Sequence, residues 1–190
     1  MFIYKNKYFL MIESIKDIDL KNIKKRNKFS IIYRNKKKLE NTTDLLNFRR
    51  FCKIKSIKFY VANNTKLAVL LNSDGLYLSA YNKSFRSLLL KKSNFEIIGS
   101  AHNLKEISLK SKQGCEMILF SKLFLVSYDK KATFLGVIRF NNYLKIFKNL
   151  IPLGGISINN LNNLNNINCQ GFALMSEVKK KPAKIFSRLL

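Results

Sequence analysis

The stretch "NSDGLYLSA" (72–80) decides the architecture, because in it a single glycine joins a helical segment to a short apolar run. The same join recurs in "SKQGCEMILFS" (111–121) and in "NCQGFALMS" (168–176). Glycine suits the end of a helix, where the chain often adopts a positive φ that other residues resist. Three such joins predict a repeated unit of helix, glycine and strand.

Short runs with the composition of β-strands recur along the whole chain. Several are apolar nearly throughout, which is typical of strands buried on both faces of a parallel sheet. The eight runs cover residues 7–12, 29–33, 57–62, 75–80, 95–101, 115–121, 150–155 and 171–176.

Between these runs lie segments in which apolar residues recur with helical spacing. The clearest are residues 42–54, 103–113 and 137–150. In the second of them we expect Leu104, Ile107 and Leu109 to lie on one side and the charged residues on the other.

Eight strands that alternate with helices predict a compact α/β fold, a (β/α)8 TIM barrel, with an open doubly wound sheet as the alternative. The 190 residues are enough for one domain with a core and too few for two. We therefore assign residues 1–190 to a single barrel domain with short connections.

The net charge of +25 by itself suggests a polyanionic partner such as RNA or DNA. Two observations weaken this interpretation. Lysine, asparagine and isoleucine are abundant together, as AT-rich codons would produce, and the lysines are spread over the whole chain. The sequence also has no nucleic-acid-binding motif. We expect a solvated, lysine-rich surface and no nucleic acid partner.

Nothing in the sequence predicts a membrane or an oxidising compartment. No apolar run approaches the roughly 18 residues of a membrane span, and the start "MFIYKNKYFLMIES" lacks the cleavage site of a signal peptide. Cys52, Cys115 and Cys169 are far apart and odd in number, which favours buried reduced thiols. These features predict a cytoplasmic protein.

The segment "LIPLGGISINNLNN" (150–163) holds two adjacent glycines in a chain that has seven. In a (β/α)8 barrel, ligands bind at the carboxyl ends of the strands, and a phosphate is often held after the seventh and eighth. The N–H groups of Gly154 and Gly155, together with those of Met175 and Ser176, could bind such a phosphate. A tight turn without a ligand is the alternative explanation of the glycine pair.

Four longer segments share an order and spacing that point to one protein family. They are "IIYRNK" (31–36), "NNTKLAVLLNSDGLYLS" (63–79), "IIGSAHNLKEISLKSKQGCEMILFSKLF" (97–124) and "IPLGGISINNLNNLNNINCQGFALMSEV" (151–178). The last is similar to a signature of Gly-Gly-Ile, a polar residue and Asn, a helix, and a strand that ends in Ser-Ala-Ile. Over about residues 28–178, the chain resembles the thiamine-phosphate synthase / TenI family.

The resemblance implies a (β/α)8 barrel with a small phosphorylated substrate and leaves room for a homodimer. The synthases are transferases of thiamine biosynthesis that join a pyrimidine pyrophosphate to a thiazole phosphate. They stabilise the leaving pyrophosphate with Mg²⁺ and basic residues. TenI proteins instead isomerise the thiazole phosphate by acid/base chemistry, with a histidine after the sixth strand.

Carried over to this sequence, the resemblance assigns four candidate residues. Arg34 and Lys36 match the basic pair that contacts pyrophosphate. Lys122 falls where TenI-type proteins have their histidine; it could act as an acid or base, bind phosphate, or simply be an exposed lysine. His102, the only histidine, could contact the substrate or serve as a structural residue at a helix start.

At the phosphate site this sequence keeps the family pattern, whereas at the metal site the family residues are replaced. The phosphate site is kept in Gly154, Gly155, Met175 and Ser176. The two acidic metal positions are occupied by Asn63 and Asn82. Because Mg²⁺ prefers carboxylate oxygen, we expect a poor metal site.

Three functions therefore stay open. The first is a divergent thiamine-phosphate synthase that still couples its two substrates. The second is a TenI-like protein that acts on a thiazole phosphate without a metal. The third is a barrel that binds a phosphorylated ligand without catalysis.

Overall fold

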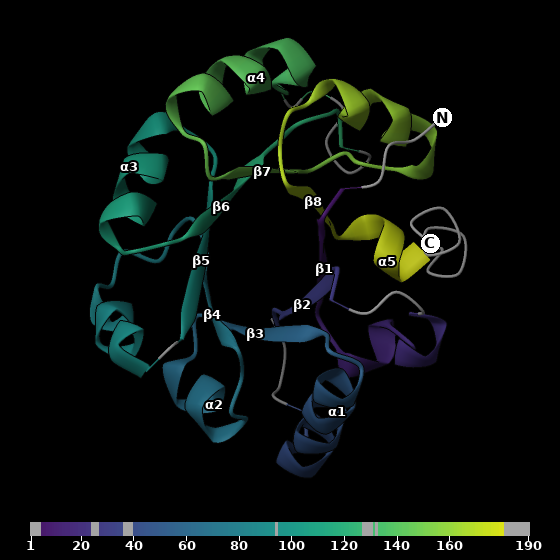
Figure 1. Ribbon diagram of the computed structural model, residues 1–190, viewed down its shortest axis with the longest axis vertical. Coiled ribbons are helices and arrows are strands. Elements are labelled where there is room, and N and C mark those ends of the chain that lie inside the picture. The colour runs from purple at the N-terminus through teal and green to yellow at the C-terminus, as the bar shows by residue number, and fades with distance from the viewer. Residues whose placement is uncertain are drawn as a thin grey trace.

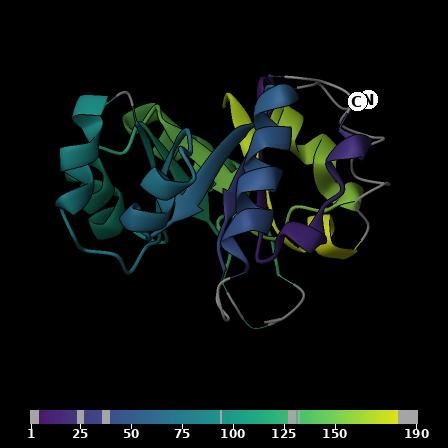
Figure 2. The same ribbon diagram turned by 90° about the horizontal axis from the view of Figure 1, so that it is seen from below.

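Eight parallel strands form a closed barrel in which each strand pairs with the next and β8 pairs with β1. The computed structural model describes residues 5–23, 27–35, 40–93, 95–126, 131 and 133–180. Figure 1 looks along the barrel and shows the ring of strands with α1 to α4 around its outside, and Figure 2 shows the same arrangement from the side. The predicted (β/α)8 barrel is confirmed, and the open doubly wound sheet is wrong.

The strands begin and end close to the predicted runs. They are β1 Lys7–Ile12, β2 Phe29–Tyr33, β3 Lys58–Ala62, β4 Gly75–Leu78, β5 Glu96–Ala101, β6 Met117–Ser121, β7 Leu150–Leu153 and β8 Gly171–Leu174. The last two are two residues shorter than predicted, because the glycine pair forms a bend and Ser176 already opens a helix.

Full helices follow only some of the strands. The α-helices are α1 Thr42–Ile54, α2 Thr65–Leu70, α3 Leu104–Lys112, α4 Gly136–Ile146 and α5 Ser176–Lys180. Shorter 3-10 segments, η1 Ile15–Asp17, η2 Leu20–Asn22, η3 Arg86–Ser93 and η4 Ile158–Asn166, follow β1, β4 and β7. This replacement of helices explains how a short chain completes eight units.

Strand residues alternate between two cores, as a period of two requires. Phe9 and Met11 of β1 lie in the core inside the barrel. Tyr8, Leu10 and Ile12 lie in the larger core between the barrel and its surrounding elements. Both faces of the sheet are therefore buried, which explains the nearly continuous apolar runs.

The glycines of the three repeated joins do not share one role. Gly114 has φ +77°, as predicted for a helix end. Gly75 and Gly171 do not have a positive φ, so that expectation is wrong for them. Both open a strand, and a Cβ there would lie 2.1 Å from the Glu96 carbonyl oxygen or 1.9 Å from that of Lys7. Close approach of the neighbouring strand requires these two glycines.

Helix α3 buries a different set of residues from the one predicted. Ile107 is buried as expected, but Leu104 is 50% exposed. Lys110 is instead fully buried, with its ammonium bonded to the carbonyl oxygen of Asn82 at 2.7 Å and to Gln113 Oε1 at 2.9 Å. Helical spacing could not predict this, because the partner carbonyl belongs to the loop after β4.

The three cysteines are free thiols, and Cys52 and Cys115 are buried as predicted. Cys169 is only partly buried. Burial raises the pKa of the Cys52 thiol to about 12, so this thiol is not a nucleophile at neutral pH. Among the described residues, no helix is long and apolar enough to cross a membrane.

Candidate functional site

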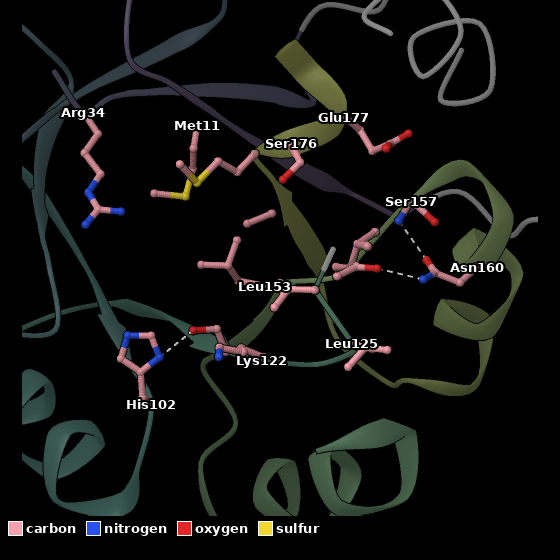
Figure 3. Close-up of a pocket in the computed structure, with 17 residues that line it drawn as sticks. Met11, Arg34, His102, Lys122, Leu125, Leu153, Ser157, Asn160, Ser176 and Glu177 are labelled. Carbon is pink, nitrogen blue, oxygen red and sulfur yellow. Dashed lines mark hydrogen bonds between the residues drawn. The ribbon is translucent and has the colours of Figure 1, made fainter. Parts of the chain in front are cut away.

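A pocket of about 480 Å³ opens at the carboxyl ends of the strands, where (β/α)8 barrels bind their ligands (Figure 3). It brings together seven of the residues predicted from the sequence: Arg34, His102, Lys122, Gly154, Gly155, Met175 and Ser176. Lys36 lies outside the described residues. Asn63 and Asn82 are not part of this lining.

The glycine pair bends the chain directly after β7. Gly154 has φ +92° and Gly155 has φ +70°. A Cβ on Gly155 would lie 2.4 Å from the Phe124 carbonyl oxygen and 2.5 Å from that of Leu125. The turn therefore has a structural reason of its own: the loop after β6 lies against it.

Both glycines of the bend line the pocket. Within the described part of the chain, the N–H groups of Gly154 and Gly155 donate to no backbone acceptor. Unpaired N–H groups in a turn attract anions. Phosphate binding at the glycine pair is thus compatible with the structural role and stays a prediction.

The loop after β6 carries Lys122 along the edge of β7. The N–H of Leu123 donates to the Leu153 carbonyl at 2.9 Å, and that of Phe124 to the Gly154 carbonyl at 3.0 Å. These bonds extend the pairing of β6 and β7 past the strand ends. They hold the backbone next to Lys122, whose side chain lines the pocket.

A carboxylate also lines the pocket, and sequence reasoning missed its position there. Met175 follows β8, Ser176 begins α5, and Glu177 lies in the first turn of that helix. A carboxylate in the first turn also suits the dipole of the helix. In Figure 3, Glu177 lies with Ser157 and Asn160 on one side of the pocket, and Arg34 and His102 lie on the other. An anion is therefore favoured on the side of Arg34.

His102 is joined to a residue that sequence reasoning did not select. Ser121 ends β6, and its Oγ lies 2.8 Å from His102 Nδ1. Both residues line the pocket. The only signal in the sequence is that Ser121 closes an apolar strand directly before Lys122. Which residue it meets depends on the neighbouring strand β5, so the pair could not be predicted.

Asn63 and Asn82 follow β3 and β4 and are bonded to each other. Asn82 Nδ2 donates to Asn63 Oδ1 at 3.0 Å, and the N–H of Ser79 donates to the same oxygen at 3.0 Å. Asn63 Nδ2 donates to Ser79 Oγ at 2.8 Å. Asn82 Oδ1 accepts the N–H of Ser84 at 2.9 Å. We call these two side chains the amide pair.

The amide pair does not fit the magnesium ion that the resemblance implies. Both amide oxygens already accept hydrogen bonds, whereas Mg²⁺ is usually held by one or two carboxylates. The buried ammonium of Lys110 lies 2.7 Å from the carbonyl oxygen of Asn82, which adds positive charge nearby. In the part of the chain that the structure describes, no group of three or more His, Cys, Asp or Glu side chains could hold a metal.

Restoring carboxylates should restore affinity for the metal. We expect the double variant Asn63→Asp, Asn82→Asp to bind Mg²⁺ at least about tenfold more tightly than the wild type, because two carboxylate ligands replace two amides. Isothermal titration with MgCl₂ measures this. The double variant Asn41→Asp, Asn64→Asp adds the same charge at the N-caps of α1 and α2. Equal Mg²⁺ affinity in the two double variants would contradict the prediction.

Comparison with known proteins identifies the family. The family model TMP-TENI, described as thiamine monophosphate synthase, matches residues 15–178. The chain belongs to the thiamine monophosphate synthase family. This confirms the resemblance found over about residues 28–178. The residues that follow β2, β5, β6, β7 and β8 in this member of the family line one pocket.

Individual relatives of this family are distant. The thiamine-phosphate synthase of Prochlorococcus marinus strain AS9601 is 26% identical over 144 residues, which make up 73% of this chain and 40% of that protein. The chain thus spans about two fifths of the length of this relative.

Solved structures agree on the fold. Thiamine phosphate pyrophosphorylase from Pyrococcus furiosus has a TM-score of 0.73 at 16% identity and covers 97% of each chain. The 3-keto-L-gulonate-6-phosphate decarboxylase of Vibrio cholerae has a TM-score of 0.59 at 10% identity and covers 98% of this chain and 99% of its own. At such low identities, these structural similarities support the barrel fold alone. The function has to be argued from the residues of the pocket.

Proposed function

We propose that this chain is a divergent thiamine-phosphate synthase that joins a pyrimidine pyrophosphate to a thiazole phosphate in the pocket. The observation that carries the proposal is the pocket itself, which Arg34, His102 and Lys122 line together with the glycine pair, whose N–H groups have no backbone acceptor in the described part of the chain. Cations and N–H donors are the groups that bind two phosphorylated substrates and stabilise a leaving pyrophosphate. Family membership makes this coupling the first reaction to test.

The reaction requires one bond to form and one to break. The thiazole nitrogen forms a bond to the methylene carbon of the pyrimidine, and the bond from that carbon to the pyrophosphate oxygen breaks. Its electron pair leaves with pyrophosphate, so no proton has to move in this step. In family members Mg²⁺ neutralises the developing charge; here we assign that task to Arg34 and Lys122.

The thiazole phosphate is assigned to the part of the pocket away from Arg34, where Lys122 lies against Gly154. The N–H groups of Gly154 and Gly155, with those of Met175 and Ser176, would hold its phosphate. Glu177 lies beside this position and would repel it. We therefore expect weaker phosphate binding than the glycine turn alone would give.

A direct assay tests the proposal. The purified protein is incubated with both substrates, with and without MgCl₂, and thiamine phosphate is measured by mass spectrometry. Product above the protein-free background supports the synthase. No product under any metal condition would refute it.

A second function is favoured by the amide pair. Because Asn63 and Asn82 do not fit a metal, a TenI-like isomerase or a non-catalytic phosphate-binding barrel would need no change at these positions. Thiazole phosphate that binds without coupling would point to this alternative. Conversion to its isomer, lost in Lys122→Ala, would then separate the isomerase from the binder.

Two substitutions, one that removes a positive charge and one that removes a negative charge, test how the charges of the pocket affect binding. Lys122→Ala should weaken thiazole-phosphate binding and Glu177→Gln should strengthen it, each by about three- to tenfold, as expected for charges at a partly exposed site. Isothermal titration at low salt measures both. Lys83→Ala, an exposed lysine outside the pocket, is the control for net charge. Parallel changes in all three variants would contradict a specific role of the pocket.

The localisation and the partners of the protein stay predictions made from the sequence. We propose a cytoplasmic protein that acts on small phosphorylated substrates, without a nucleic acid partner, and a homodimer is left open. Sedimentation and titration with duplex DNA at physiological salt measure the last two points.

A further inference from the structure

Ser121, at the end of β6, is almost completely buried. The residue is 7% exposed, and its Oγ is 2.8 Å from His102 Nδ1. Among the described residues, the ring of His102 is the one hydrogen-bond partner of this hydroxyl. A buried hydroxyl that donates to nothing loses free energy, so the Ser121 proton is best placed on the bond to Nδ1.

This bond determines which ring nitrogen carries the proton. In the neutral ring, Nδ1 accepts from Ser121 and the proton resides on Nε2. In the charged ring, Nδ1 carries a proton as well and Ser121 Oγ accepts it. A hydroxyl can do both, since it is a donor and an acceptor. Nε2 therefore carries a proton in either state and remains a hydrogen-bond donor.

The backbone of His102 is held independently. Its N–H donates to Glu106 Oε2 at 2.7 Å, and Asn103 and Glu106 cap the start of α3 with bonds of 2.9 Å. The residue is thus anchored at its backbone by α3 and at its ring by β6. An anchored donor loses less conformational entropy when a ligand binds than a mobile side chain does.

The free edge of the ring faces the basic side of the pocket. In Figure 3, the dashed line from the His102 ring marks the bond at Nδ1, and the other ring nitrogen, Nε2, points toward the side on which Arg34 lies. Among the residues that the structure describes, the charged side chains lining the pocket are Arg34 after β2, Lys122 after β6 and Glu177 in α5, with Glu177 on the far side. Glu106 in α3 bonds the backbone of His102 and not its ring.

We propose that Ser121 is a positioning residue that presents the Nε2–H of His102, together with Arg34, to a pyrophosphate-type oxyanion. This deepens the proposed function, on which the choice of pyrophosphate rests. Ser121 itself does not touch the ligand. It acts by fixing the tautomer and the orientation of the ring.

The tautomer can be measured without any activity, because the chain has a single histidine. ¹⁵N shifts of the imidazole are recorded at about pH 8.5, above the usual range of a histidine pKa. We expect the Nε2–H tautomer in the wild type and in Ser121→Thr, and a mixture of tautomers in Ser121→Ala. Ser87→Ala, which removes a buried hydroxyl without a partner among the described residues, should match the wild type. An Nδ1–H tautomer in the wild type, or no change in Ser121→Ala, would overturn the proposal.

Titration with inorganic pyrophosphate tests the ligand. The His102 signal should shift in the wild type, and Ser121→Ala should weaken binding by about three- to tenfold, with recovery in Ser121→Thr. An unshifted His102 signal at saturation would overturn the proposal. If pyrophosphate shifts the signal but no thiamine phosphate forms in the coupling assay, the proposed function fails while the role of Ser121 stands.

Discussion

Gly155→Ala should lower the free energy of unfolding by about 2–5 kcal/mol, which combines left-handed backbone strain with overpacking. Gly155 has φ +70°, and its added Cβ would overlap the carbonyl oxygens of Phe124 and Leu125 at 2.4 and 2.5 Å. Both contacts are backbone atoms, which cannot rotate away as a side-chain end can. The loop after β6 must therefore move, and it carries Lys122 with it. Urea unfolding measures the loss of stability, and titration with the thiazole phosphate measures weaker binding.

Gly136→Ala is the matched control for this variant. Gly136 has a nearly equal φ of +68°, yet a Cβ there would meet nothing within 4 Å. It should lose only the backbone part, about 1–2 kcal/mol. Equal losses in the two variants would show that the loop does not press on the glycine pair, and the structural explanation of the turn would fail.

Lys110→Ala should be similarly damaging, with a loss of about 3–5 kcal/mol from a cavity and an unpaired buried acceptor. Lys110 is fully buried, and its hydrocarbon stem is so close to β5 that a Cβ on Gly99 would lie 2.9 Å from it. Its ammonium bonds Gln113 Oε1 and the carbonyl of Asn82. Gln113 also bonds that carbonyl, at 3.0 Å, so the Gln113 oxygen loses more than Asn82 does.

Lys110→Met separates packing from hydrogen bonding. Methionine fills most of the space of the stem, so only the acceptor term of about 1–3 kcal/mol should remain. Unfolding by urea, followed by circular dichroism, gives both values. A loss in Lys110→Met as large as that in Lys110→Ala would mean that the ammonium, and not the stem, accounts for the stability.

The difference in stability between the wild type and Lys110→Met should also depend on pH. Burial lowers the pKa of the Lys110 ammonium, although Cys115 and Glu106 nearby oppose the shift. The unfolded chain, with an ordinary lysine pKa of about 10.4, then binds the proton more tightly than the folded protein. Stability from this group therefore rises as the pH increases from the lowered pKa toward that value. The wild type should gain stability relative to Lys110→Met over this alkaline range; a constant or shrinking difference would contradict the pKa shift.

The glycine pair shows how far sequence reasoning reached into the site. Two adjacent glycines in a glycine-poor chain indicated either a phosphate site or a tight turn after the seventh strand; the structure shows the turn at the pocket, and phosphate binding stays a prediction. The reason for the constraint was not predictable. It is the carbonyl groups of Phe124 and Leu125, some thirty residues away in the chain, which only the pairing of β6 with β7 brings there.

The polar and charged residues of the pocket were likewise predicted only in part from the sequence. Arg34, His102 and Lys122 were predicted from the resemblance to the family, and the structure places all three in the lining of the pocket at the carboxyl ends of the strands. Ser121 and Glu177 were missed as pocket residues. Their side chains matter through what the fold places near them: the ring of His102 beside Ser121, and Arg34 across the pocket from Glu177.

The sequence by itself determined the eight strands, their parallel order, the family and the loops that carry the site. The strands follow from local periodicity and spacing along the chain, which need no knowledge of neighbours, and the family follows from the resemblance of four longer segments to it. Only the tertiary structure decided that Lys110 is buried, that Asn63 and Asn82 bond each other, and that Ser121 Oγ meets His102 Nδ1. Each of these depends on which residue of a neighbouring strand or loop comes within about 3 Å, the range over which a hydrogen bond acts.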